Sequence, residues 1–540
     1  MYKFVISRKR MWCIFILFFI MFALLFLRLF QYQYLNSKKY SAMAEAQYSY
    51  SENTEDFNFK LLDRNGNDLS QYKDNYYAVI VPSAFKSKLN TDTEAIMNMT
   101  YALRNYDDSY DLSNIDILKD NPKLYWEIDA QTFKYVKALK QIQGVYVFQC
   151  KELQKRGTWN VESILLNPRR TVDNSLKSED SIEIQIYNRV KNNKYPKVVI
   201  ERDVSGNITG ESSILPDDNV NVKLTLDKTI QSRMDSILKS EKYKKYKQLG
   251  AVMMESSSGK ILGMVQKDDS QPNVNMGAAT DGGFYPGSIF KIIVEEAALG
   301  SNSIELSDKF TCRGYYEDAH KNHGTLTSHE AMVVSCNDIY AQIGNKTGYK
   351  AFYGMAEKQG LFSKVIGFDS ELSGEVDVAQ PVISNGSISI AAMGQGIRIT
   401  PLEALSISNT VANGGIYVKP YLVDSYIDNN SKVTETNSTI KSRVFDSYIA
   451  DEIKSQMQDV VETGTARGTQ INGIEIGGKT GTTQRNNLSD GWFAGYFNID
   501  GKNYSMVVFA ENIDKVTESG GSTAAPIFKD IVENTEDILK

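Results

Sequence analysis

Ser288 and Lys291 stand three residues apart, a spacing that can support nucleophilic chemistry. On a helix, residues at this spacing share one face and lie one turn apart. A serine hydroxyl is a poor nucleophile until a base takes its proton, and a nearby lysine can do so when its charge is disfavoured. Gly287 suits a sharp turn into a helix N-terminus, where free backbone N–H groups can hold an oxyanion. The pair alone is weak evidence, because other serine-x-x-lysine pairs occur, such as Ser70 with Lys73.

Two further motifs follow in chain order, Ser335-Cys336-Asn337 and Lys479-Thr480-Gly481-Thr482. Lys479 ends a short alternating run and precedes a second strand candidate at residues 492–497, so we expect it on a strand with a paired neighbour. Another Lys-Thr-Gly begins at Lys346, but it follows a helical stretch and has no strand pattern around it. The three motifs in this order are strong evidence for one serine acyl-transfer site.

The elements expected around these motifs form an α+β arrangement. Residues 250–255 and 260–265 flank a serine-rich turn and predict a hairpin. A central antiparallel sheet built from this hairpin and the strand pair around Lys479, flanked by helices, accounts for the layout. Helices are expected at residues 228–242, around Ser288, after Asn337, at residues 400–413 and at residues 528–532.

The length of 540 residues leaves room for two or three domains. The composition is that of a globular protein, and the net charge of −6 gives no sign of nucleic-acid binding. Residues 31–223 predict short strands and polar loops, with a turn at Asp63-Arg64-Asn65-Gly66 and no catalytic constellation. We expect a mixed α/β spacer and docking module there, with a boundary near residue 223.

The N-terminus has the pattern of a membrane anchor. Residues 1–10 carry four basic side chains, and the run from Met11 to Leu27 is almost wholly apolar. Such a run can span a bilayer, and the basic flank predicts a cytoplasmic N-terminus. The alternative is a cleaved signal peptide, but bulky residues follow instead of a small-x-small cleavage site. We expect residues 1–10 to be a cytoplasmic tail, residues 11–30 an uncleaved single-pass anchor, and the rest of the chain to lie outside the cytoplasm.

The part of the chain from Leu224 onward resembles the transpeptidase domain of class B penicillin-binding proteins. The anchor and the turn at Asp63 resemble the membrane-proximal pedestal of that family, although Phe59-Lys60 stands where the family usually has Arg-Gly. The resemblance implies a penicillin-binding/serine β-lactamase-like fold, with a pedestal at residues 31–223 and a transpeptidase domain at residues 224–540. Beyond the three catalytic motifs, it rests on Leu224-Thr225-Leu226-Asp227, Tyr285-Pro286-Gly287-Ser288, Gly394-Gln395-Gly396, Thr400-Pro401, Ala412-Asn413-Gly414-Gly415, Gly464-Thr465-Ala466 and Ala525-Pro526-Ile527-Phe528.

The implied reaction is peptidoglycan cross-linking through a serine acyl-enzyme. Ser288 would attack the penultimate D-alanine of a stem peptide, with Lys291 as the proton acceptor. Ser335 and Lys479 would carry a proton to the leaving amine, while Asn337 holds Lys291 and the substrate amide. No cofactor is required for this acyl transfer.

Substrate binding is expected on the Lys479 strand, with the peptide added alongside it as a further strand. Thr480 and Thr482, separated by Gly481, would bind the terminal carboxylate, and by resemblance the Ser288 and Thr482 N–H groups would form the oxyanion hole. β-Lactams should acylate the same serine. Relatives pair with a multispanning glycosyltransferase of the shape, elongation, division and sporulation (SEDS) family, so such a partner is expected here, in cell-shape, division or sporulation-linked wall synthesis.

Two other functions are compatible with the motifs. A β-lactamase or β-lactam sensor of the same fold would share the catalytic residues, but such proteins are usually shorter and have no use for a long pedestal. A non-catalytic scaffold would not need the intact set of Ser288, Lys291 and Lys479.

The rare residues of the chain predict a metal site. All three histidines and two of the four cysteines fall between Cys312 and Cys336. A disulfide between these two cysteines is one interpretation, since an extracytoplasmic chain permits it, and two free thiols are another. Together with His320 and His323, however, the two thiolates offer a ligand set that suits tetrahedral zinc.

Resemblance supports this zinc site. Some class B relatives hold zinc beside the active site, with a cysteine inside the serine-x-asparagine motif and a histidine thirteen residues earlier, and Cys336 and His323 match both positions. Relatives tend to supply an acidic ligand shortly before that histidine, so Glu317 or Asp318 can replace His320. His329 is the least expected ligand. A metal bound to Cys336 would brace the residues on either side of it.

Overall fold

The computed structural model describes the chain except for residues 1–7, 32–33, 35–48, 87–92, 114–122, 155–157, 171–173, 204–207, 318–320, 378–380 and 486–487. The chain forms two compact units that are not consecutive in sequence. The first contains Met1–Asn58, Gln71–Gln154 and Lys194–Pro216, and the second contains Phe59–Ser70, Lys155–Asn193 and Asp217–Lys540. Two segments before residue 223 therefore belong to the second unit.

The first unit begins with the apolar helix α1 (Arg8–Phe30). Its segment Met11–Phe30 has a mean hydropathy of 2.8, and its side chains are exposed. Among the described residues, this is the one helix long and apolar enough to cross a membrane, since twenty helical residues extend about 30 Å. It fits a single-pass anchor.

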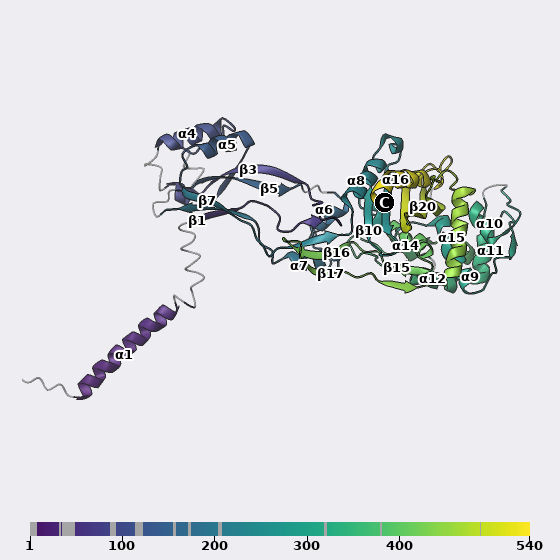
Figure 1. Cartoon of the computed structure of the whole chain (residues 1–540), viewed down its shortest axis with the longest axis horizontal. Coiled ribbons are helices and arrows are strands. Elements are labelled where there is room, and N and C mark those ends of the chain that lie inside the picture. Colours follow the sequence, from purple (N-terminus) through teal and green to yellow (C-terminus); the bar gives the residue numbers. More distant parts are fainter. Residues whose placement is uncertain are drawn as a thin grey trace, which may run out of the picture. The chain divides into compact units, whose positions relative to one another are not determined.

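The rest of the first unit consists of two small antiparallel sheets (Figure 1). One has the strand order β4-β3-β5 and packs its apolar face against helices α4 and α5. The other has the order β1-β6-β7. Their bounds are β1 (Ser49–Asn53), β3 (Tyr72–Ile80), α3 (Pro82–Lys86), α4 (Thr93–Arg104), β4 (Leu124–Ile128), α5 (Ala130–Ala138), β5 (Val145–Leu153), β6 (Lys197–Arg202) and β7 (Ile208–Ile214).

The second unit is built on a five-stranded antiparallel sheet with the order β10-β9-β21-β20-β19. The predicted hairpin is β9 (Gln248–Glu255) with β10 (Ile261–Gln266), and the predicted pair around Lys479 is β19 (Glu475–Arg485) with β20 (Leu488–Ile499). Both predictions are confirmed. The strand β21 (Lys502–Ile513), which was not anticipated, pairs with β9 and β20 and joins them into one sheet. β19 therefore lies at an edge.

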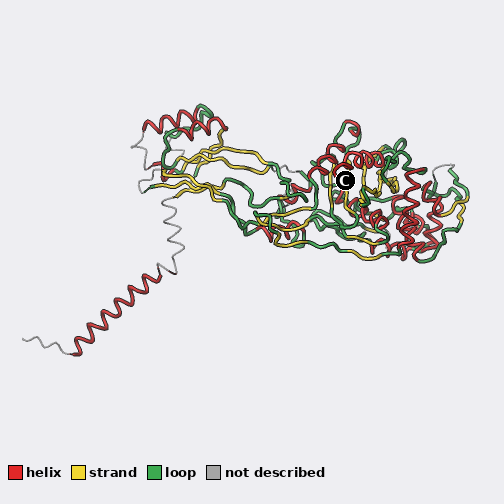
Figure 2. The backbone as a smooth tube through the Cα atoms, viewed as in Figure 1, coloured by secondary structure: helices red, strands yellow, loops and turns green. Residues whose placement is uncertain are grey.

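Helices pack against both faces of this sheet, and Figure 2 shows helices (red) beside the strands (yellow) of this unit. Successive residues of a strand point to opposite faces, and β21 shows this directly. Tyr504 donates a hydrogen bond to the last turn of α16 (Ala524–Leu539), whereas Ser505 bonds Asn409 on α14 (Pro401–Ala412). α16 packs with α8 (Lys228–Leu238) on its face. α14 is buried along its whole length and starts at a capping box between Thr400 and Glu403.

A group of helices beside the sheet edge carries the remaining motifs, and Figure 1 shows α9 to α12 gathered next to α15. Their bounds are α9 (Lys291–Gly300), α10 (Ser328–Val334), α11 (Asn337–Thr347), α12 (Tyr349–Lys358), α13 (Ser387–Ala392) and α15 (Ser447–Glu462). Short strands connect them, namely β11 (Lys309–Thr311), β12 (Thr325–Thr327), β13 (Glu375–Val376), β14 (Ile397–Arg398), β15 (Ile416–Val418) and β18 (Lys441–Arg443).

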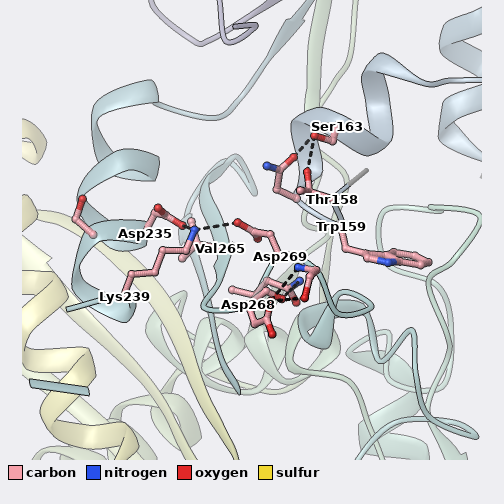
Figure 3. Close-up of polar contacts among 12 residues, drawn as sticks. Thr158, Trp159, Ser163, Asp235, Lys239, Val265, Asp268 and Asp269 are labelled. Carbon is pink, nitrogen blue, oxygen red and sulfur yellow. Dashed lines mark hydrogen bonds and ion pairs between the residues drawn. The ribbon is translucent and has the colours of Figure 1, made fainter. Parts of the chain in front are cut away.

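The two early segments of the second unit are fixed to it by polar contacts. β2 (Leu61–Leu62) pairs in parallel with β8 (Val220–Leu224), in a sheet completed by β16 (Val423–Asp428) and β17 (Val433–Thr436). The later segment carries α6 (Val161–Leu166) and α7 (Ile182–Val190). Figure 3 shows its start, where the Trp159 N–H donates to the Asp269 carbonyl and the Asp269 carboxylate pairs with Lys239. This segment thus packs against α8 and the turn after β10.

Candidate active site

Ser288 lies in a 3-10 turn, Gly287–Phe290, that leads directly into α9. Gly287 has a φ of +55°, and a Cβ there would lie 2.6 Å from the Thr483 side chain and 2.9 Å from the Thr482 carbonyl oxygen. Only glycine allows this backbone conformation and this approach to β19. The turn therefore places the partly exposed Ser288 beside the Lys-Thr-Gly strand.

The amine of Lys291 is buried between the motifs. Its Nζ donates to the Ser335 carbonyl oxygen at 2.7 Å and to the Asn337 Oδ1 at 2.7 Å, and it lies 3.3 Å from the Ser335 Oγ. Burial lowers the pKa of Lys291 to about 7, because a charged amine loses its hydration there. The lysine can therefore act as a base near neutral pH.

Ser335 reaches Lys291 through an unusual backbone conformation. It is the C-cap of α10 and adopts the left-handed region, with a φ of 58° and a ψ of 39°. A residue with a side chain is uncommon in this region, and such outliers cluster at functional sites. The turn directs the Ser335 carbonyl to Lys291 and its hydroxyl to Lys479.

Lys479 approaches the same serine from the opposite side. Its Nζ lies 2.8 Å from the Ser335 Oγ and 3.2 Å from the Thr480 carbonyl oxygen, and its side chain is fully buried. Burial, and then the nearby charge of Lys291, hold the pKa of Lys479 well below its ordinary value. Two buried amines therefore share one hydroxyl, an arrangement that can pass a proton from one to the other.

The Lys-Thr-Gly strand forms the other wall of the site. Gly481 lies against the turn before Ser288, since a Cβ on it would be 2.6 Å from the Pro286 carbonyl oxygen. The Thr480 hydroxyl lies 2.7 Å from the Thr465 hydroxyl, and the Thr482 hydroxyl accepts a hydrogen bond of 3.0 Å from the Gly520 N–H.

Thr465 and Gly520 were not identified as site residues from the sequence. Thr465 belongs to the Gly464-Thr465-Ala466 motif of the resemblance, which was an available signal. Gly520 stands in a Gly-Gly pair far along the chain, and nothing local connects it to the strand.

Three of the predicted metal ligands lie close together, and Glu317 is the fourth member of the cluster in place of His320. The ligand atoms of Cys312, Glu317, His323 and Cys336 all lie within 4.8 Å of one another. Glu317 thus takes the place open to an acidic residue, whereas His320 and Asp318 lie outside the described residues.

His329 lies away from this cluster. Its Nε2 is 2.7 Å from the Asp459 carboxylate, and its Nδ1 is 3.3 Å from the Glu452 carboxylate. It links α10 to α15.

The cluster fits zinc by its chemistry and spacing. Zinc bonds of about 2.0 Å to nitrogen and 2.3 Å to sulfur place tetrahedral ligand atoms about 3.3–3.8 Å apart. The His323 Nδ1 is 3.9 Å from the Cys312 Sγ and 3.8 Å from the Glu317 Oε1. No described residue hydrogen-bonds the buried Nε2 of His323. Burial raises the pKa of the Cys336 thiol, and a bound cation would lower it, because metals bind the thiolate.

The part of the chain that carries the three motifs is similar to known proteins. The family model of the penicillin-binding protein transpeptidase domain matches residues 249–533. Stage V sporulation protein D of Bacillus subtilis is 26% identical, over 98% of this chain and 85% of that protein. Peptidoglycan D,D-transpeptidase PbpA of Mycobacterium tuberculosis is also 26% identical, over 53% of this chain and 66% of that protein.

Solved structures show the same fold. PBPA from Mycobacterium tuberculosis aligns with a TM-score of 0.52 and 25% identity, over 58% of this chain and 82% of that chain. A peptidoglycan synthetase from Bifidobacterium adolescentis aligns over 91% of this chain and 96% of its own, with a TM-score of 0.62 and 18% identity, a likeness of fold alone. With the matched domain covering more than half of its residues, the chain belongs to the penicillin-binding protein transpeptidase family.

Proposed function

We propose that Ser288 is the nucleophile of this peptidoglycan D,D-transpeptidase and that Lys291, Ser335, Asn337 and Lys479 complete its catalytic machinery. The observation that carries the proposal is the Ser335 hydroxyl held between two buried lysine amines, next to the turn that bears Ser288.

The reaction begins when Lys291 takes the proton of Ser288. The Ser288 Oγ then attacks the carbonyl carbon of the penultimate D-alanine, and the developing oxyanion is held by the backbone N–H groups of Ser288 and Thr482. As the amide bond breaks, the leaving D-alanine amine receives a proton through Ser335 and Lys479. The amine of a second stem peptide then attacks the acyl-enzyme and forms the cross-link, and a proton of that amine passes to the Ser288 oxygen, which frees the serine.

The substrate lies along the free edge of β19. An extended peptide can add to an edge strand through main-chain hydrogen bonds, and β19 offers such an edge beside Ser288. Thr480 and Thr482, with Gly481 between them, bind the terminal carboxylate, and their hydroxyls are oriented by Thr465 and Gly520.

Covalent capture tests the nucleophile. The full chain in detergent should gain the mass of one β-lactam on the peptide that contains Ser288, and Ser288→Ala should abolish this gain while keeping the unfolding temperature. Labelling that persists in the variant would overturn the assignment. A slow loss of the label supports a transpeptidase, whereas rapid turnover of penicillin would identify the β-lactamase alternative.

We further propose that Cys312, Glu317, His323 and Cys336 bind a structural zinc ion. When bound, the ion would hold the start of α11 in place, because Glu317 already accepts the N–H groups of Asn337 (2.6 Å) and Asp338 (3.2 Å).

Elemental analysis of the purified chain should find about one zinc per molecule, because the four ligand residues suffice for one tetrahedral ion. Cys336→Ser should lose both the metal and thermal stability. A metal-free protein with a Cys312–Cys336 disulfide and full acylation would contradict the site and establish the alternative interpretation.

For the rest of the chain we propose a membrane-proximal pedestal at residues 31–223, of which residues 59–70 and 155–193 fold with the second unit. We also propose a transpeptidase domain at residues 224–540 and a SEDS-family glycosyltransferase as membrane partner. The supporting features are α1, the basic residues before it and the two sheets of the first unit. Residues 1–10 lie inside the cell. Protease added to intact, wall-stripped cells should then release the bulk of the chain, and protection of that part would contradict this orientation.

A further inference from the structure

Behind the catalytic lysine, α9 carries two adjacent carboxylates that the reaction does not use. Glu295 and Glu296 are both fully buried, and burial raises the pKa of each. Neighbouring residues on a helix point in different directions, so the two carboxylates meet different partners. Glu296 accepts a hydrogen bond from the Gln359 amide that follows α12. Glu295 instead faces α11 and α15.

The contacts of Glu295 lead back to the active site. Its Oε2 accepts a hydrogen bond of 3.0 Å from the Tyr340 hydroxyl, and its Oε1 accepts one of 3.2 Å from the Gln456 amide. Both partners are fully buried. The Nζ of Lys291 lies 5.4 Å from the centroid of the Tyr340 ring. Glu295 therefore fixes the Tyr340 ring through the hydrogen bond to the Tyr340 hydroxyl, and this ring faces the amine of Lys291.

We propose that Glu295 is a positioning residue for Lys291 and acts through Tyr340. During acylation the proton of Ser288 moves to the Lys291 Nζ, which becomes an ammonium in a fully buried position. The negative face of an aromatic ring attracts an ammonium within about 6 Å of its centroid. A hydrogen bond from the phenol to a carboxylate polarises the ring further and keeps this face toward Lys291. The inference rests on the proposed role of Lys291.

Three conservative variants of the full chain separate this role from a structural one. Glu295→Gln keeps the volume and an acceptor for Tyr340 but replaces the carboxyl group with an amide. Tyr340→Phe keeps the ring and removes the hydrogen bond. Glu296→Gln is the matched control, because Glu296 lies on the same helix, is equally buried and bonds Gln359 instead of Tyr340.

The measurements are the second-order rate of acylation by a fluorescent penicillin as a function of pH, and the unfolding temperature. We expect Glu295→Gln and Tyr340→Phe each to lower the plateau rate about tenfold, because the ammonium that forms on Lys291 loses stabilisation. For the same reason the pKa of Lys291 falls. The acidic limb of the curve of acylation rate against pH therefore moves about half a unit to lower pH. The double variant should be no slower than the slower single variant, because both changes act through the same Glu295–Tyr340 pair.

The other titratable groups that act on this pair are unchanged in sequence in all three variants. Glu317, Cys336 and Lys479 act on Lys291, and Glu452 acts on Glu295. The control Glu296→Gln should alter the unfolding temperature at most, with rate and limb unchanged.

Two outcomes would overturn the proposal. If Glu295→Gln lowers the unfolding temperature but keeps the rate and the limb, as the control does, Glu295 only ties helices together. If Glu295→Gln does not fold, Tyr340→Phe removes the same contact from the other side, and an unchanged rate there would also refute the inference. Failure of the proposed function is distinct, because the unaltered protein would then show no acylation of Ser288.

Discussion

The two walls of the candidate active site are built by different means. The strand wall is β19 with its partner β20, held by a ladder of eleven residue pairs from Glu475 to Arg485. The Ser-x-Asn wall is α10, the turn at Ser335 and the start of α11, and side chains hold it together. A backbone ladder tolerates side-chain changes, whereas the second wall depends on a few specific groups. Substitutions of similar size should therefore have larger effects on the Ser-x-Asn wall.

The largest effect on the acylation rate is expected at Ser335. Two variants of this residue separate the effect of its backbone strain from the effect of its hydroxyl. Ser335→Gly and Ser335→Ala both delete the hydroxyl between the lysines and should lower the acylation rate about 100-fold or more. Glycine adopts the left-handed region without steric cost, so Ser335→Gly should be more stable than Ser335→Ala by about 1 kcal/mol. Thermal unfolding and β-lactam acylation measure the two properties. Equal stability of the variants would show that the turn stores no strain.

The pH dependence should report on Lys291. Because burial lowers its pKa to about 7, the acylation rate should rise about tenfold per pH unit below that value and level off above it. The same shift makes the folded protein bind fewer protons than the unfolded chain between about pH 7 and 10.5, so Lys291 should make stability rise with pH there. A rate that is flat between pH 5 and 8 would mean that Lys291 is not the base.

The smallest effect is expected on the strand wall. Thr465→Val removes the hydroxyl that lies 2.7 Å from Thr480 while keeping the shape of the side chain. We expect a loss of about threefold to tenfold in acylation rate, the size of one neutral hydrogen bond, with an unchanged acidic limb and unfolding temperature. A loss as large as that of Ser335→Ala would remove the distinction between the walls.

The sequence predicted the candidate catalytic residues because their chemistry is local to short motifs. Ser288, Ser335 and Lys479 could be assigned from type and order, and the strand character of Lys479 followed from its flanks. The left-handed turn at Ser335 was not predictable, since nothing in Ser-Cys-Asn requires it without the contacts to Lys291 and Lys479.

Long-range contacts account for the other omissions. β21 was not predicted, because its place in the sheet depends on pairing with β9 and β20. Glu295 and Tyr340 are separated by 45 residues, so their bond has no local sequence signal.

The crossing of the chain between its two units has a consequence for synthesis and export. β2 emerges early, but its partner β8 follows only after a separation of 161 residues between Lys60 and the Asn221 that it bonds. If the chain is exported from its N-terminus, β2 is therefore exported before β8. It stays without this partner until most of the first unit has also been exported. A fragment that starts at residue 224 would also lack β2, β8, α6 and α7, so Leu226 and Ile230, which pack in the same core, would lose neighbours. Such a fragment should unfold at a lower temperature than one that also retains residues 59–223.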